Sequence, residues 1–132
     1  MDAVRNLPET NMKVFWKMPP GLKVRFNEEL NESNILLRHG NFELAWRKLE
    51  RSHILGQSWA VEHTYVHWKM LLFAFRIKNT REIFGQLPRI LVGGVKSYVG
   101  KIPVGNTGGA NVPPLKSMPV PADIKELMKG YL

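Results

Sequence analysis

Three of the four histidines in this chain fall within fifteen residues, in a segment that otherwise has the apolar composition of a protein core. Glu50 precedes His53 by three positions, and His63 precedes His67 by four, so each pair would share one face of a helix. An imidazole on a buried face must be hydrogen-bonded, protonated or coordinated to a metal ion. The pattern therefore indicates a polar site inside a small protein, without naming its ligand or reaction.

The two pairs are expected to meet, because the helices that carry them are joined by only one or two residues around Gln57. Helices with so short a connection lie antiparallel and adjacent. At a rise of about 1.5 Å per residue, His53 and His63 would lie at a similar height, and His67 would face Glu50. Four ligand-type side chains would converge across one interface, and we predict that they bind a divalent transition metal.

Imidazole and carboxylate ligands suit zinc, iron, manganese, nickel or copper, and the sequence does not discriminate among these ions. Three histidines and a carboxylate could close a tetrahedral zinc site, whereas two histidines and a carboxylate would leave positions open for water or substrate. Polar side chains expected to support the site or line its pocket are Gln57, Glu82, Gln86 and Arg89. The loop expected to cover it contains Gly105, Asn106, Thr107, Gly108 and Gly109.

Two known metal motifs do not fit the spacing. A ferritin-like two-metal bundle needs a Glu-x-x-His pair on each of two helices, and only Glu50 with His53 provides one. A zincin helix needs a glutamate directly after its first histidine, where this chain has Thr64. No catalytic residue is assigned, and binding is favoured over catalysis. The alternative is a metal-free helical protein–protein interaction module whose hydrogen-bonded histidines only stabilise the core.

The composition indicates a small domain without a membrane span. With 132 residues, 44% of them hydrophobic, the chain can bury a core. No apolar run approaches the roughly 20 residues that cross a bilayer, and the first residues do not form a secretion signal. We therefore expect a soluble, cytoplasmic protein. The absence of cysteine excludes disulfides, thiolate metal sites and cysteine nucleophiles.

The net charge of +8 raises a second alternative, a polyanion or nucleic-acid partner. Lysines and arginines are scattered from Arg5 to Lys129 without a basic run, which favours a dispersed, solvated surface. The closely spaced glycines of residues 105–109 could approach a phosphate, but no P-loop lysine accompanies them. Nucleic-acid and nucleotide binding are therefore the weaker interpretations.

Apolar periodicity predicts an all-α fold, a small antiparallel helical bundle followed by a long Gly/Pro-rich C-terminal loop. The expected helices span residues 19–39, 42–57, 59–78 and 81–87, with a short last helix from Ala122. Asn41 and Ser58 are expected to cap the second and third helices, and Pro88 to bend or end the fourth. Residues 40–51 also resemble the first helix of a tetratricopeptide unit, but no second copy follows, so a single hairpin with similar packing is expected.

These elements divide the chain into three parts. Residues 1–18 form an irregular lead-in, residues 19–92 the helical bundle, and residues 93–132 a Gly/Pro-rich wrapping loop with a short C-terminal helix. The lead-in is apolar enough to pack on the body. On the third helix, a narrow polar stripe is expected to contain Glu62, Tyr65, Lys69 and Arg76.

Several segments of the sequence together resemble a bacterial domain-of-unknown-function family, number 3703. They are residues 49–57, 63–68, Glu82 with Gly85, Gln86 and Arg89, residues 103–109, and residues 118–121. The resemblance covers about residues 22–124. It implies a compact domain with no settled activity, whose motif positions coincide with the polar residues selected above.

Overall fold

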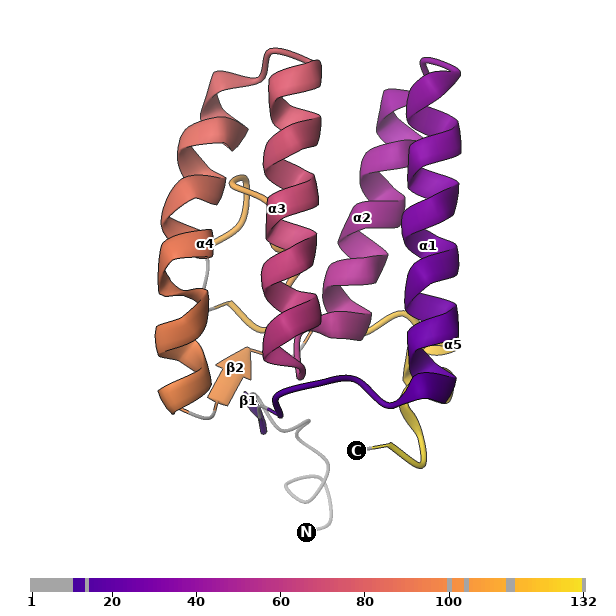
Figure 1. The fold of residues 1–132 in the computed structure, drawn as a ribbon, viewed down its shortest axis with the longest axis vertical. Coiled ribbons are helices and arrows are strands. Elements are labelled where there is room, and N and C mark those ends of the chain that lie inside the picture. Colours follow the sequence, from indigo (N-terminus) through magenta and orange to yellow (C-terminus); the bar gives the residue numbers. More distant parts are fainter. Residues whose placement is uncertain (1–10, 14, 100, 104, 114–115, 132) are drawn as a thin grey trace, which may run out of the picture.

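The computed structural model describes the chain except for residues 1–10, 14, 100, 104, 114–115 and 132. Five helices dominate the described residues, and the four longer ones form two hairpins that stand side by side (Figure 1). Their bounds are Pro20–Arg38 for α1, Phe42–Gly56 for α2, Ala60–Arg76 for α3, Thr80–Val99 for α4 and Ala122–Met128 for α5. The predicted all-helical class is confirmed, and none of these helices combines the length and the apolar character that crossing a membrane requires.

The hydrophobic core forms where the apolar faces of α1, α2 and α3 meet. On α1, Leu22, Phe26 and Leu30 recur every four residues and are buried. Val66 and Met70 of α3 follow the same spacing and are fully buried. Burying each side chain of this size contributes about 1.5–3 kcal/mol. This packing fixes α2 and α3, the two helices that carry the histidines, relative to each other.

Short turns make successive helices antiparallel. Gly40 follows α1 with φ of +77°, as expected for a glycine at a helix C-terminus, and Lys78 takes the same left-handed conformation after α3 with φ of +57°. The N-cap residues of α2 and α3 are Asn41 and Trp59, and neither makes a side-chain cap. The side-chain capping predicted for Asn41 is therefore wrong, whereas that predicted for Ser58 stays a prediction.

The fourth helix, expected to bend or end at Pro88, continues through this residue to Val99. A proline removes one helical hydrogen bond and crowds the carbonyl four residues before it. The Arg89 guanidinium donates to the carbonyl of Gly85 at 2.8 Å, in the turn next to the proline. Residues 93–99, expected to begin the Gly/Pro-rich loop, are consequently helical.

The segment before α1 crosses the turn between α2 and α3. It contains strand β1 (Asn11–Lys13), which pairs antiparallel with β2 (Lys101–Pro103) in a ribbon that the sequence did not predict. The N–H of Phe15 donates to the carbonyl of Ser58 at 2.6 Å, and the N–H of Ala60 donates to the carbonyl of Phe15 at 2.8 Å. This segment therefore packs on the turn that joins the two histidine-bearing helices.

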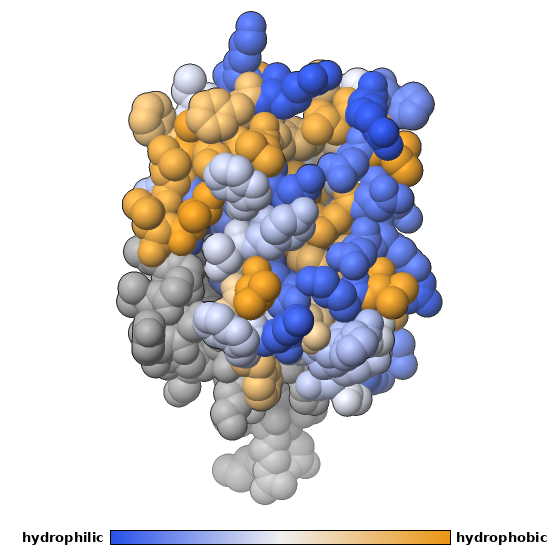
Figure 2. Space-filling view, viewed as in Figure 1, coloured by the Kyte–Doolittle hydropathy of each residue, from blue (hydrophilic) through white to orange (hydrophobic). Residues whose placement is uncertain are grey.

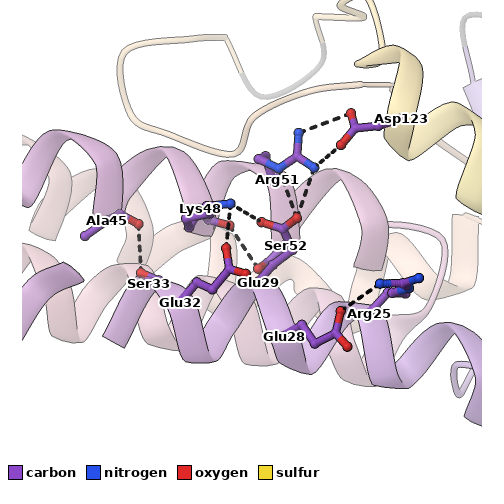
Figure 3. Close-up of polar contacts among 10 residues, drawn as sticks. All are labelled: Arg25, Glu28, Glu29, Glu32, Ser33, Ala45, Lys48, Arg51, Ser52 and Asp123. Atoms are coloured by element: carbon purple, nitrogen blue, oxygen red, sulfur yellow. Dashed lines mark hydrogen bonds and ion pairs between the residues drawn. The ribbon is translucent and has the colours of Figure 1, made fainter. Parts of the chain in front are cut away.

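An ionic cluster fixes α2 against α1 and α5 (Figure 3). The Arg51 guanidinium donates to Glu29 of α1 at 3.0 Å and pairs with Asp123 of α5. Lys48 pairs with Glu32 at 2.6 Å. The hydrogen bond from Arg51 lowers the pKa of Asp123, and the hydrogen bond to Glu32 raises the pKa of Lys48.

Candidate metal centre

Three imidazole rings from α2 and α3 meet in the interior of the bundle. The Nε2 atom of His53 lies 2.9 Å from that of His63 and 3.1 Å from that of His67, and the last two atoms are 3.1 Å apart. His53 comes from α2, whereas the other two lie one turn apart on α3. Within the part of the chain that the structure describes, these side chains form the group that could hold a metal ion.

The cluster is almost fully removed from solvent. The relative exposures of His53, His63 and His67 are 3%, 6% and 2%. The ring centroids are 4.7–4.8 Å apart, and the ring planes are inclined to one another by 57–70° rather than stacked. The rings therefore direct their edges, where the nitrogen atoms are, toward a common point. A polar group this deeply buried is stable only when its hydrogen-bonding or coordination capacity is used.

The outer nitrogen atoms of two rings are held by oxygen acceptors. His53 Nδ1 lies 2.6 Å from the backbone carbonyl oxygen of Asn106, and His67 Nδ1 lies 2.7 Å from Oε1 of Gln86. The Gln86 amide nitrogen donates to Gly108 O at 2.9 Å and to Glu82 Oε2 at 3.1 Å. Those two bonds assign its oxygen to the histidine. Because both partners are acceptors, Nδ1 of each ring carries the proton.

A neutral imidazole protonated at Nδ1 presents a lone pair at Nε2. When both rings are neutral, the lone pairs of His53 and His67 face each other at 3.1 Å, and neither can donate a hydrogen bond to the other. Two such acceptors repel unless a positive group lies beside both of them. A metal ion supplies that charge, as does a proton on the neighbouring Nε2 of His63, 2.9 Å from His53.

The spacing of the three nitrogens suits coordination. Zinc binds imidazole nitrogen at about 2.0–2.1 Å, which in a tetrahedral site separates two ligand nitrogens by roughly 3.3 Å. The observed separations of 2.9–3.1 Å are shorter by a few tenths of an ångström. An ion could therefore bind with a small outward movement of the rings, and without a change of rotamer or helix position.

The segment that covers the cluster, residues 105–112, is attached to the helices along its length. Gln57 accepts a hydrogen bond from the N–H of Gly105 at 3.0 Å. Glu82 accepts one from the N–H of Ala110 at 2.8 Å. These bonds add to the contact between His53 and the carbonyl of Asn106, so the side chains of α2 and α4 hold the segment over the rings.

Further attachments secure the distal end of this segment. Arg89 Nη2 donates to the carbonyl of Val112 at 3.0 Å, and burial lowers the pKa of this guanidinium. The side-chain amide of Asn106 donates to the carbonyls of Pro113 and Lys116 at 2.9 and 2.7 Å. The polar residues that sequence reasoning placed around the site all bond this segment: Gln57, Glu82, Gln86 and Arg89. Sequence reasoning missed Ala110 and Val112, because backbone anchors carry no side-chain signal.

Gly108 lies directly against the His53 ring. Its φ is +83°, and a Cβ atom at this position would come within 2.5 Å of His53 Cδ2. Glycine alone satisfies both the backbone conformation and the close contact without strain. The backbone therefore closes over one face of this imidazole.

Glu50, predicted to share the site, is not in the group formed by the three histidines. Its side chain is half-buried and bonds Thr107 of the covering segment. Burial raises the pKa of Glu50, with a smaller opposing effect of Arg47. The carboxylate thus lies at the edge of the covering segment, while the described contacts of His67 are with the other histidines and Gln86.

Glu62, predicted to lie on a narrow polar stripe of α3, is fully buried. Its carboxylate accepts from Lys23 Nζ at 2.9 Å and from the N–H of Met18 at 3.2 Å. Partners on the preceding segment and α1 compensate its charge, which a helical projection of α3 alone does not reveal. His39 lies exposed at the end of α1, and its Nδ1 lies 2.8 Å from the carbonyl of Ile35.

No curated protein and no solved structure gives a significant match to this chain. The family described as a protein of unknown function (DUF3703) matches residues 20–128. The matched span contains the three histidines and the segment that covers them, and it confirms the resemblance identified in the sequence. The chain belongs to domain-of-unknown-function family 3703.

Proposed function

We propose that this protein binds one divalent transition-metal ion through the Nε2 atoms of His53, His63 and His67. The observation that carries the proposal is the convergence of three buried Nε2 atoms within 3.1 Å, while two of the rings keep their protons on Nδ1. A proton shared among the rings is the competing explanation. Such a proton would bridge only two of the three Nε2 atoms at a time, whereas an ion contacts all three.

The donor set indicates the class of ion. Neutral imidazoles suit zinc, copper, nickel, iron and manganese in differing degrees, and a chain without cysteine offers no thiolate that would select a soft ion. Three protein ligands leave at least one position for water, a substrate or a further ligand. A water at that position could become a nucleophile near neutral pH, so hydrolysis is the first reaction to test once binding is established.

Glu50 enters the proposal as the carboxylate that a bound ion would attract. It precedes His53 by one helical turn on α2, and its hydrogen bond to Thr107 connects it to the covering segment. Burial raises the pKa of Glu50, because the charged carboxylate is less well solvated there than in water. A cation held by the histidines would offset this cost, whether Glu50 coordinates it directly or through water.

Metal titration of tag-free protein tests the proposal. Chelator-treated protein is titrated with zinc chloride in a calorimeter, and the metal content after gel filtration is measured by mass spectrometry. We expect one zinc ion per chain, and a loss of affinity of at least a hundredfold in His63→Ala and His67→Ala. His39→Ala is the matched control, because His39 is exposed at the end of α1 and should bind zinc like the parent protein.

Circular dichroism of each variant establishes that it remains folded. Substoichiometric zinc in the parent protein would contradict the proposal. Equal zinc affinity in folded His63→Ala, His67→Ala and His39→Ala would also contradict it, and would leave the cluster with a structural role in a metal-free interaction module.

A further inference from the structure

Helix α3 carries a second apolar stripe on the side that faces away from the core. Its members expose between 41% and 57% of their surface and are separated by four, three, four and three residues: Val61, Tyr65, Trp68, Leu72 and Phe75. Alternating steps of three and four residues define the seam of a helix that packs on another helix. The opposite side of α3 already buries Val66, Met70 and Phe73, so the exposed stripe is not needed for the core.

The neighbouring helix extends this apolar surface. On α4, Phe84, Leu87 and Leu91 continue the same three-and-four spacing and expose 72%, 41% and 80% of their surface. Figure 2 shows hydrophobic residues gathered on the upper left of the molecule, where Figure 1 places α4 and the adjoining end of α3. The stripe of α3 and these three residues together form one face of the α3–α4 hairpin, which we call the hairpin face.

The hairpin face is larger than an ordinary surface patch. Its four aromatic and four aliphatic side chains expose on the order of 700 Å², taking about 150–250 Å² for a whole aromatic side chain. The largest apolar patch on a typical monomer is about 300–600 Å². A stable interface of standard size buries about 800 Å² on each partner. The exposed area therefore matches one half of a protein–protein interface.

We infer that the hairpin face is the interface of a homodimer, in which α3 of one copy packs antiparallel on α3 of the other. An apolar seam with three-and-four spacing can pack on a second helix with the same spacing, and a second copy supplies one through a two-fold axis. The charged side chains of α3 nearest the stripe, the partly exposed Lys69 and the exposed Arg76, lie beside it and not within it. Apolar residues alone therefore occupy the predicted contact.

This assignment is independent of the histidine cluster. His63, Val66 and His67 point to the buried side of α3, whereas the stripe lies on its exposed side. A monomeric protein could still bind zinc, and a dimer could form without zinc. His67→Ala should therefore remain dimeric, so that failure of the metal proposal and failure of this one are distinguishable.

Sedimentation equilibrium of the full chain, with and without zinc, tests the dimer. We expect twice the chain mass of 15.2 kDa at tens of micromolar protein. A change in the stripe should raise the dissociation constant of the dimer at least tenfold more than a change at a control position on the surface. Leu72→Glu should give a monomer. Val24→Glu is the matched control, since Val24 is exposed on α1, outside the hairpin face, and should leave the dimer intact.

Cross-linking provides a second measurement that does not depend on a charged substitution. The chain has no cysteine, so Trp68→Cys introduces a single thiol into the stripe and Val24→Cys a single thiol outside it. A short bismaleimide should join two copies of Trp68→Cys covalently and leave the chains of Val24→Cys without a cross-link. Monomeric parent protein, equal cross-linking of both variants, or a dimer that survives Leu72→Glu would overturn the inference. Sedimentation of a monomer with anionic vesicles would assign the hairpin face to a lipid surface instead.

Discussion

His53 and His67 turn their Nε2 atoms to within 3.1 Å of each other, while Nδ1 of each ring lies beside an oxygen acceptor. The acceptor of His53 is the backbone of Asn106, and that of His67 is the side chain of Gln86. The surroundings of the rings thus determine which nitrogen atoms face inward. They prepare two lone pairs for a cation before any cation binds.

Gln86 connects one of these rings to the covering segment, so Gln86→Met should weaken zinc binding. Methionine preserves the approximate size of the side chain but leaves His67 Nδ1 and the carbonyl of Gly108 without this partner. Loss of such an outer hydrogen bond typically lowers metal affinity about 10–100-fold. The free energy of unfolding of metal-free protein should fall by about 1–3 kcal/mol. Calorimetric zinc titration and urea unfolding measure the two effects.

Ser33→Ala is the matched control for this experiment. The Ser33 hydroxyl is buried and donates to the carbonyl of Ala45 at 2.7 Å, in the contact between α1 and α2. Its loss should lower the unfolding free energy by about 1–2 kcal/mol and leave zinc affinity unchanged. If Gln86→Met affected stability alone, as the control does, the proposed role of Gln86 in orienting His67 would be wrong.

Gly108→Ala should separate the cost of a backbone conformation from the cost of crowding the imidazole. Gly108 and Gly40 have φ of +83° and +77°, but only the former has a neighbouring ring where a Cβ would lie. Gly40→Ala should therefore cost about 1 kcal/mol of stability. Gly108→Ala should cost about 2–3 kcal/mol and also weaken zinc binding, because the segment must move away from His53. Equal stabilities and zinc affinities of the two variants would show that this contact is unimportant.

The stabilisation that the ion pair between Arg51 of α2 and Asp123 of α5 provides should depend on pH. Arg51 lowers the pKa of Asp123, so the stabilisation is complete above the ordinary aspartate pKa of 3.8 and is lost as the pH falls through the lowered value. Asp123→Asn should therefore reduce the unfolding free energy at pH 7 by no more than about 1 kcal/mol, since this pair is partly exposed. In metal-free protein at strongly acidic pH, the parent and the variant should have the same stability.

Urea unfolding at several pH values measures this difference. Glu126→Gln is a suitable control, because its pair with Lys129 is more exposed on both sides and lies within α5 and its end. A difference between Asp123→Asn and the parent that persists unchanged into strong acid would exclude the proposed electrostatic origin.

Much of the helical framework follows from local sequence. The periodic apolar residues and Gly40 predict α1, α2 and α3 nearly to their observed ends, and hairpin geometry brings His53 to His63. The course of α4 was less predictable, because a proline can either bend or end a helix and local sequence does not decide which. The tetratricopeptide-like packing and the division into three parts stay predictions.

The polar environment of the site depended on contacts distant in sequence. Local periodicity cannot show that Asn106 lies beside His53, or that Lys23 compensates a buried Glu62. For the same reason, sequence reasoning expected Glu50 among the ligands, since it shares a helix face with His53. Helical spacing predicts which residues share a side of the bundle, but the covering segment determines which of them meet at one point.

Anomalous X-ray diffraction from zinc-loaded crystals, measured on both sides of the zinc absorption edge, tests the central claim most directly. We predict a single strong peak at about 2.0–2.1 Å from the Nε2 atoms of His53, His63 and His67. A zinc ion bound elsewhere, or contacted by fewer than three of these nitrogens in zinc-saturated protein, would contradict the account.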